Sequence, residues 1–353
     1  MTNFRSALPA LALAVLSLAV AACKGPGSSV APGGFPTCNP CGVPHAQYVV
    51  VGDVITPGLL TFNLGETKTL NSGNLTPTYK NTSTHLSQPF FIFNDFSSNL
   101  WAAEYAGASL TWFAVSATGG TPTSHSISGA STTLGCPTGV YISQNGTIYV
   151  ADPCSTNGYP TVDEFAAGAS GNVAPVAWIG GSVTALGFPQ GISIDSKGNL
   201  WVIDTATPSI DKFPSSLASG QNNIPATGEI TSSALSEPDE IYIDYQSHIW
   251  IGDLLGGPGD TPAVYEFNSS TGVQSPLCTI SGSNTGITNS SGQVSVAVDN
   301  GGYVYAVDAL NPTINIFDPG QCGNVTPAYT ITGSNTSITN PAAILVYSTG
   351  NDY

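Results

Sequence analysis

The chain has 353 residues, of which 6 are Lys or Arg and 22 are Asp or Glu, so its formal net charge is −16. Contacts to nucleic-acid phosphates and to anionic lipid headgroups need clustered Lys and Arg, and this charge therefore argues against both kinds of partner. Hydrophobic residues make up 41% of the chain, which is enough to build a core and argues against wholesale disorder. The 40 Gly and 26 Pro favour strands and turns over helices.

The first 22 residues are typical of a secretory signal peptide. Arg5 supplies a positive charge, and an apolar stretch from Ala7 to Ala22 follows it. This stretch is shorter than the roughly 20 residues that cross a membrane. The segment ends in Val20-Ala21-Ala22-Cys23, which resembles the lipobox of bacterial lipoproteins. The resemblance implies that the Cys23 thiol is diacylated and that Cys23 is the first residue of the mature chain; an ordinary signal followed by a chance cysteine is the alternative.

Residues 23–46 are rich in Pro, Gly and Ser without a periodic apolar pattern, which is typical of a flexible tether. We therefore expect an exported protein of the bacterial cell envelope that is held at the membrane by its N-terminal lipid. In a Gram-negative host, Lys24 in place of Asp directly after the cysteine favours the outer membrane. The sequence holds no second apolar run of spanning length, so the lipid is expected to be the only anchor.

From residue 47 onward the chain repeats itself, most clearly in the unit FPQGISIDSKGNLWVIDTATPSIDKF at 188–213. Similar units begin near residues 88, 136, 237 and 292. Each unit has a Pro near its start, or once Gln293 in that place, followed fifteen residues later by an acid and then by a Phe. The recurring acids are Glu104, Asp152, Asp204, Asp253 and Asp308.

Each unit is long enough for four strands. In the unit at 188–213, apolar residues alternate with period two on either side of Ser196–Asn199, which predicts two strands joined by a tight hairpin. The stretch that ends at Phe213 is a predicted third strand, and a Pro followed four or five residues later by Ile marks a fourth. Four strands in about 50 residues are typical of a β-propeller blade. The pairs that mark the fourth strand are Pro122/Ile127, Pro175/Ile179, Pro225/Ile230, Pro276/Ile280 and Pro327/Ile331.

The two ends of the chain supply one more unit between them. The last unit begins at Pro341 and stops near its hairpin turn at Gly350, while the missing part stands at residues 47–62. Five complete units and one shared unit predict an all-β domain over residues 47–353, a six-bladed β-propeller of four-stranded antiparallel blades. Sharing one blade between the termini closes the ring and removes free sheet edges. An open stack of the same repeats is the alternative, and we expect a monomer.

These units resemble the NHL-repeat family of six-bladed propellers. The resemblance is carried by P-x-G-I/V at 137–140 and 189–192, by D-x-x-G-N at 195–199, and by W/Y-V-x-D-type endings at 149–152 and 201–204. It covers roughly residues 47–353 and implies a fold. It implies little about function, because that family includes enzymes, binding modules and scaffolds.

Six cysteines remain when Cys23 is set aside, an even number for an exported chain. A hairpin turn at Gln144-Asn145 would place two of them almost opposite each other. The Cys-x-x-Cys spacing in the tether is not surrounded by a βαβ pattern, which argues against a redox role. A zinc site would need a second Cys/His pair at suitable spacing, and the sequence shows none. The candidate disulfides are Cys136 with Cys154, Cys278 with Cys322, which flank one blade, and Cys38 with Cys41.

Acidic and aromatic side chains recur at fixed places in the units. We interpret the recurring acids and the acids of the hairpin turns as caps that accept backbone N–H hydrogen bonds, the former at the turn leaving the third strand. A ring of carboxylates that collects a cation is the alternative. The recurring aromatic residues, which we place on the third strand, are expected to pack between blades rather than to form a sugar-stacking array. The turn acids are Asp195, Asp244 and Asp299, and the aromatics are Trp101, Tyr149, Trp201, Trp250 and Tyr305.

One blade departs from the pattern at Glu237, Asp239 and Glu240. Two other units have Gly where this one has Glu240, at Gly139 and Gly191. In six-bladed propellers the starts of the inner strands border the central channel, and carboxylates there would suit Ca²⁺, which prefers oxygen ligands. A solvated acidic loop is the alternative, and we predict no other cofactor.

No catalytic constellation stands out. The four His, at 45, 85, 125 and 248, have no repeating spacing, so we expect no His-metal site, and the G-x-S-x-G, Walker A and HExxH motifs do not occur. We therefore assign no catalytic residue and expect a non-enzymatic binding or scaffold protein with a protein or glycan ligand. A metal-dependent hydrolase or lyase similar to the six-bladed gluconolactonases is the alternative, with Glu237, Asp239 or Glu240 near the metal.

Overall fold

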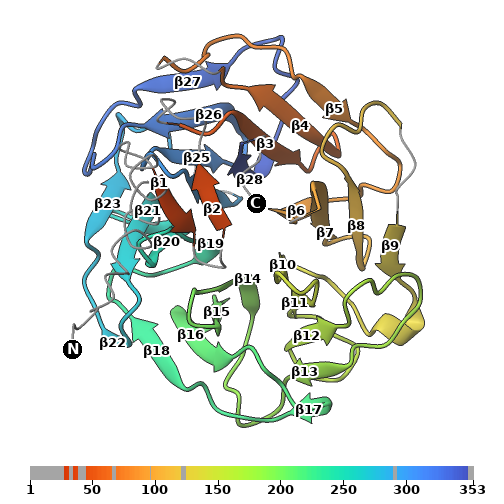
Figure 1. The fold of residues 1–353 in the computed structure, drawn as a ribbon. Helices are drawn as coiled ribbons and strands as arrows, with labels where there is room; N and C mark the ends of the chain where they lie inside the picture. The colour runs from red at the N-terminus through yellow and green to blue at the C-terminus, as the bar shows by residue number, and fades with distance from the viewer. Residues whose placement is uncertain are drawn as a thin grey trace, which may run out of the picture.

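Six four-stranded antiparallel sheets form a closed ring, so the protein is an all-β, six-bladed β-propeller, as the repeat predicts (Figure 1). The structure is a computed structural model that describes residues 28–31, 35–38, 45–65, 69–95, 97–120, 125–288 and 292–348. Its other regular elements are a hairpin of β1 (Ser28–Ala31) and β2 (Phe35–Cys38), the 3-10 turn η1 (Ala130–Thr132), and two short rim strands.

The blades follow one another in chain order, and each runs from an inner strand at the ring centre to a fourth strand at the rim. We number them from the blade that contains the first propeller strand of the chain. Blade 1 is β28 (Pro341–Tyr347), β3 (Tyr48–Asp53), β4 (Gly58–Asn63) and β5 (Tyr79–Asn81); blade 2 is β6 (Pro89–Asn94), β7 (Asn99–Glu104), β8 (Ser109–Ala114) and β9 (His125–Ser128); blade 3 is β10 (Gly139–Ile142), β11 (Ile148–Asp152), β12 (Thr161–Phe165) and β13 (Ala177–Ile179). Blade 4 is β14 (Pro189–Ile194), β15 (Asn199–Asp204), β16 (Ser209–Pro214) and β18 (Gly228–Thr231); blade 5 is β19 (Pro238–Ile243), β20 (His248–Gly257), β21 (Thr261–Asn268) and β23 (Cys278–Ser281); blade 6 is β24 (Val294–Val298), β25 (Val304–Asp308), β26 (Asn311–Phe317) and β27 (Tyr329–Thr332).

Blade 1 closes the ring, because its inner strand comes from the C-terminal part of the chain and its other three strands from the N-terminal part. β28 pairs antiparallel with β3 from Pro341 opposite Asp53 to Tyr347 opposite Tyr48. The predicted shared blade is therefore confirmed, and the open stack is not formed.

All six inner strands run in the same direction through the ring. Each begins on one side of the disc, which we call the start face, and ends at the hairpin turn to its second strand on the other side, which we call the hairpin face. Residues near Asp239, at the beginning of β19, therefore lie on the start face. Residues of the turns around Asp95 and Ser143 lie on the hairpin face.

The recurring aromatic residues and acids lie on the second strand of each blade, not on the third. Trp201 lies near the beginning of β15, and Asp204 ends that strand. The sequence prediction places them one strand too far out, although it correctly places the turn between the first and second strands around Ser196–Asn199. The same correction applies in blades 2, 3, 5 and 6.

In blades 2, 4, 5 and 6 the acid of the hairpin turn holds both the turn and the aromatic side chain that follows it. Asp195 Oδ1 accepts hydrogen bonds from the backbone N–H groups of Lys197 and Asn199, and its Oδ2 accepts one from Trp201 Nε1 at 3.0 Å. Burial of the indole between blades therefore leaves no unpaired N–H. The same pattern joins Asp95 to Trp101, Asp244 to Trp250, and Asp299 to the hydroxyl of Tyr305.

The recurring acid of each second strand, which ends that strand in every blade except blade 5, fixes the start of the inner strand beside it. Asp204, for example, accepts backbone hydrogen bonds from Gly187 and Phe188 at 2.6 and 2.8 Å and from Ala206 at 3.0 Å. The predicted capping role is thus confirmed, with the addition that each carboxylate joins two segments. The corresponding residues in the other blades are Asp53, Glu104, Asp152, Asp253 and Asp308.

Apolar side chains are buried between blades. The described residues form six hydrophobic clusters, and each contains residues of two neighbouring blades. The cluster between blades 4 and 5, for instance, contains Trp201, Ile210, Ile241 and Phe267. Because each blade has a neighbour on both sides, the ring buries both faces of every sheet.

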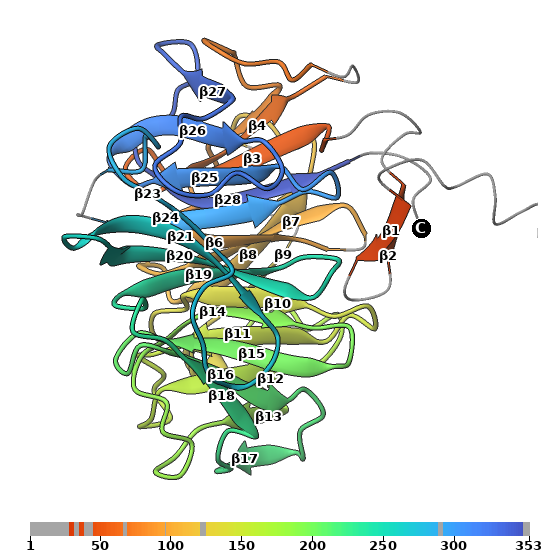
Figure 2. The same cartoon turned by 90° about the vertical axis from the view of Figure 1, so that its left-hand side faces the viewer.

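Neighbouring blades are also connected at the rim. The fourth strand of every blade forms a parallel pair with a segment of the next blade. Figure 2 shows β17 (Gly220–Asn222) of blade 4 beside β13 of blade 3. The pairs cover backbone edges that would otherwise be free to join other strands. The other five are β18 with β22 (Gly272–Val273), Asn81 with Gly119, Ile127 with Gly171, Ile280 with Gly323, and Ile331 with Gly73.

The N-terminal approach to the propeller begins before residue 47. His45 and Ala46 are buried, and the Ala46 N–H donates to Asp299 Oδ2 at 2.8 Å on the hairpin face. The predicted tether therefore meets the ring on this face, and the β1–β2 hairpin lies within its sequence. The predicted signal peptide and Cys23 lie outside the described residues. Within the described part of the chain, no helix is long and apolar enough to span a membrane.

Candidate functional site

Two neighbouring carboxyl groups on β19 lie at the start face near the centre of the ring. Asp239 is 6% exposed and Glu240 is 3% exposed. Asp239 accepts hydrogen bonds from Gln190 Nε2 of blade 4 at 3.3 Å and from the Val294 N–H of blade 6 at 3.1 Å. Its carboxylate therefore joins three blades at the channel.

Burial dominates the electrostatics of this pair. It raises the pKa of Asp239 well above the usual range of an aspartate, and the nearby Asp253 and Glu237 raise that pKa further. The pKa of Glu240 is likewise raised well above its usual range, by burial first and by Asp239 second. Glu237 is only half-buried, and its N–H donates to Asp253 Oδ1. The structure thus separates the predicted trio into two buried acids and one acid at the rim of the site.

Glu240 is the only acid at its position in the inner strands. The strand register places it opposite Gly252, the residue before the recurring acid Asp253 of the second strand. Most of the equivalent residues are small because the backbone of the next blade lies against them: a Cβ on Gly139 would lie 2.4 Å from the Gln190 carbonyl oxygen. The residues at this position in the other blades are Phe91, Gly139, Gly191, Ser295 and Ala343.

A hollow of about 360 Å³ opens on the other side of the ring, at the hairpin face between blades 2 and 3. Its aromatic wall consists of Trp101 and Trp112, stacked with ring centroids 4.1 Å apart, and of His125, whose ring lies 5.2 Å from that of Trp112. Blade 3 contributes Gln144 and other residues of its hairpin turn. This volume is in the range of small-molecule sites.

Trp112 explains why the hollow forms here. It stands opposite Trp101 in the register of β7 and β8, at a position where no other blade has a tryptophan. Trp101 itself follows the general pattern, since its Nε1 donates to Asp95 Oδ2 at 2.7 Å. The residues equivalent to Trp112 are Thr61, Glu164, Lys212, Glu266 and Ile316.

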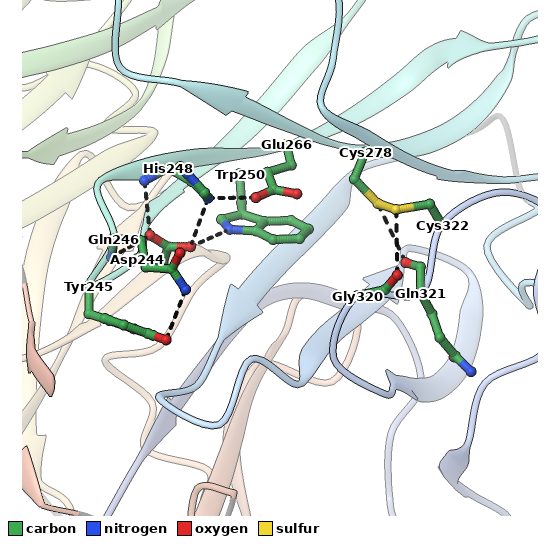
Figure 3. A network of polar contacts seen from close by, with 10 residues as sticks. All are labelled: Asp244, Tyr245, Gln246, His248, Trp250, Glu266, Cys278, Gly320, Gln321 and Cys322. Atoms are coloured by element: carbon green, nitrogen blue, oxygen red, sulfur yellow. Dashed lines mark hydrogen bonds and ion pairs between the residues drawn. A yellow bond between two sulfur atoms is a disulfide. The ribbon is translucent and has the colours of Figure 1, made fainter. Parts of the chain in front are cut away.

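A third group of polar side chains lies at the hairpin face of blade 5 (Figure 3). His248 Nδ1 lies 2.6 Å from Glu266 Oε1 and 3.8 Å from Asp244 Oδ2, and the three side chains are close enough together to hold a metal ion. The geometry thus differs from the expectation that no His would join a possible metal site. Asp244 already accepts bonds from the Gln246 and His248 N–H groups and from Trp250 Nε1, as the other turn acids do. The ordinary turn structure therefore accounts for most of this group.

Three carboxyl groups toward the start face have raised pKa values: the second-strand acid Glu104, and Asp163 and Asp211, which lie near the second-strand acids of their own blades. Burial raises the pKa of Glu104 to about 7. Burial, assisted by Asp152, raises the pKa of Asp163 to about 8. Burial, assisted by Glu229 and Asp204, raises the pKa of Asp211 to about 7. At a pH between the ordinary pKa of a carboxyl group and these raised values, the folded protein binds protons that the unfolded chain has released.

Two of the three candidate disulfides are formed. Cys136 bonds to Cys154 within blade 3, and Cys278 bonds to Cys322 across the seam between blades 5 and 6 (Figure 3). Cys41 and the side chain of Cys38 lie outside the described residues, as does Cys23. Disulfides of this kind persist in oxidising compartments and are compatible with export.

Trp112, His125, Gln190 and Glu266 were not predicted as site residues. For Trp112 a signal was present in the sequence, because the repeat alignment shows a bulky aromatic residue where other units have Glu, Lys, Ile or Thr. Gln190 and Glu266 gave no comparable signal, since their importance depends on contacts to Asp239 and His248 in other strands.

No protein-family model matches the sequence, and no curated protein matches it. Among solved structures, a chain of a nidogen/laminin complex aligns with a TM-score of 0.57 and 15% identity, covering 85% of this chain and 97% of that one. A protein of unknown function from Bacteroides caccae aligns with a TM-score of 0.54 and 10% identity, covering 85% and 98%. The WD40 β-propeller domain of Doa1 aligns with a TM-score of 0.50 and 12% identity, covering 84% and 82%. At these identities the similarity shows the fold alone.

Proposed function

We propose that this propeller is an exported, lipid-anchored binding protein that holds a small neutral saccharide in the hollow between blades 2 and 3. The observation that carries the proposal is the stacked pair of Trp101 and Trp112 in a hollow of about 360 Å³, at a position where the other blades have no tryptophan. The fold by itself supports many functions, so function has to be inferred from a specific site such as this one.

The lining favours an uncharged ligand with one flat apolar face. Trp101 and Trp112 are 5% and 8% exposed, so they offer the hollow a small apolar surface against which the C–H groups of a sugar ring can pack. Gln144 and His125 offer polar groups beside it. Among the described residues, no lysine or arginine lines the hollow. With a net charge of −16 the protein as a whole repels anions. A glycan therefore fits the site better than a phosphorylated or carboxylated compound.

Anchoring through Cys23 is part of the proposal. It is supported by the lipobox-like sequence and by the course of the chain, because Ala46 is bound to Asp299 on the hairpin face. The predicted tether of residues 23–46 would then approach the ring from the membrane side. The NHL-like repeat and a monomeric cell-envelope protein belong to the same proposal.

A metal-dependent hydrolase acting at Asp239 and Glu240 is less well supported by the geometry. The low exposure of these carboxyl groups, 6% and 3%, does not decide between the two sites, because Trp101 and Trp112 of the hollow are only 5% and 8% exposed. Asp239 is, however, bonded to Gln190 and to the Val294 N–H. Because both Asp239 oxygens already accept these bonds, the pair suits a structural role better than a substrate site.

Tryptophan fluorescence tests the proposed binding site. Neutral mono- and oligosaccharides would be titrated into the wild-type protein and into Trp112→Lys, which copies Lys212 at the equivalent position of blade 4. We expect a saturable change in the wild type that is absent in Trp112→Lys. Trp178→Lys is the matched control, because Trp178 is partly exposed on β13 away from the hollow. Equal binding by Trp112→Lys, or binding only of other proteins, would contradict the proposed site.

A further inference from the structure

The inner strands are joined at the start face by a belt of polar contacts that passes from blade to blade. Thr138 Oγ1 donates to the Pro189 carbonyl at 2.9 Å, and Gln190 Nε2 donates to Asp239 Oδ1 at 3.3 Å. Asp239 Oδ2 in turn accepts the Val294 N–H. Among the described residues at the beginnings of the inner strands, only those of blade 5 include carboxylates.

This belt leaves buried oxygen acceptors without hydrogen-bond partners. Glu240 Oε2 and Gln190 Oε1 are both fully enclosed and accept no hydrogen bond. Glu240 is 3% exposed and Gln190 is 7% exposed, so solvent does not satisfy them. Because Gln190 Nε2 contacts Asp239, the unpartnered Oε1 of the same amide group must lie close to that carboxylate. Buried acceptors without partners are costly and point to a missing donor or cation.

The surrounding side chains supply no positive charge. No lysine or arginine of the described chain is bonded to Asp239 or Glu240, and the whole sequence has only 6 such residues. Glu237 adds a further negative charge beside Asp239. Two adjacent buried carboxyl groups without a cationic partner are strongly unfavourable when both are ionised.

We propose that Asp239, Glu240 and the Gln190 side-chain oxygen hold a Ca²⁺ ion at the channel end of blade 5, between blades 4 and 6. All three ligands are hard oxygen donors, which suits Ca²⁺ rather than a transition metal. The ion would satisfy Glu240 Oε2 and Gln190 Oε1 together and offset the charge of both carboxylates. Its role is structural, since the ligands are closed to substrate, and it does not depend on the ligand proposed for the hollow.

Metal binding by the isolated protein tests this site. After dialysis against a chelator near pH 7.5, Ca²⁺ would be returned while binding and thermal unfolding are recorded, with metal content measured by mass spectrometry. We expect about one Ca²⁺ per chain and a higher melting temperature. Glu240→Gln should lower the Ca²⁺ affinity at least about tenfold, yet melt higher than the wild type when Ca²⁺ is absent, because it removes a buried charge.

Three further variants locate the ion. Glu237→Gln, at the half-exposed rim of the site, should bind Ca²⁺ as the wild type does. Glu266→Gln should also bind normally, because it alters only the Asp244–His248–Glu266 group. Gln190→Ala removes one ligand without changing charge and should weaken binding, which keeps the test decisive if Glu240→Gln fails to fold. No Ca²⁺ uptake by the wild type, full binding by Gln190→Ala and Glu240→Gln, or loss in Glu266→Gln would each overturn the proposal.

Discussion

Asp163 should make the protein lose stability as the pH rises from mildly acidic to neutral. Its carboxyl is fully buried in blade 3, with Oδ2 accepting a bond from Thr161 Oγ1 at 3.0 Å and Oδ1 accepting none. Burial, with Asp152 nearby, raises its pKa from 3.8 to about 8. The folded state therefore keeps a proton that the unfolded chain releases near pH 4. The stabilisation is complete below that pH and is lost as the pH rises toward 8.

The size of the effect follows from the proton difference. Between about pH 5 and about pH 7 the folded protein binds one more proton at Asp163 than the unfolded chain does, and each pH unit then costs ~1.4 kcal/mol. The free energy of unfolding should fall by about 3 kcal/mol over this interval because of this single carboxyl group. Asp163→Asn keeps the shape and the acceptor for Thr161 but cannot titrate, so it should lack this part of the slope.

Urea unfolding of both proteins at the two pH values measures the difference directly. Other buried carboxyl groups titrate in both proteins and cancel in the comparison. Asp260→Asn is the matched control, because Asp260 is exposed in a turn of blade 5 and should leave the slope unchanged. Parallel pH profiles for the wild type and Asp163→Asn would refute the reasoning, since they would mean that the carboxyl group is hydrated or charged in the folded state.

Two other predictions concern the links within and between blades. Replacing Cys278 and Cys322 by Ser opens a loop of 44 residues, and the chain-entropy model gives a loss of about 4 kcal/mol; an unchanged urea midpoint under non-reducing conditions would contradict the bond. Asp195→Ala should cost about 2–3 kcal/mol, because it leaves the buried Trp201 Nε1 and two backbone N–H groups without their acceptor. Calorimetry of this variant beside Asp260→Ala checks the cost, and equal melting temperatures would show that the turn acid is dispensable.

The fold could be predicted because the strands and turns of each blade follow from patterns within one short repeat unit. The two strands around Ser196–Asn199, the fourth strand before Ile230 and the half-units at Pro341 and residues 47–53 follow from period-two alternation and turn residues within short segments. The error over Trp201, placed on the third strand instead of the second, came from the count of strands within the unit. The pairing of Cys136 with Cys154 was predictable for the same local reason.

The candidate sites depend on contacts between segments that are distant in the sequence. Gln190 and Asp239 meet across two blades, and His248 meets Glu266 from the next strand. Nothing in a single unit fixes such contacts, because they depend on how the blades are rotated about the ring axis. Glu240 was found because its charge breaks the repeat, and Trp112 breaks it in the same way. Departures from a repeat are thus the part of a site that a sequence can reveal.

Fluorine NMR of the protein labelled with 5-fluorotryptophan tests the central claim most directly. The chain contains five tryptophans, at 101, 112, 178, 201 and 250, so each can be followed by its own resonance. The account predicts that a neutral saccharide that binds will shift the resonances of Trp101 and Trp112, which line the hollow, and leave that of Trp178 in place. A ligand that shifts Trp178 alone, or a saccharide panel that shifts none of the five, would contradict the assignment of function to this hollow.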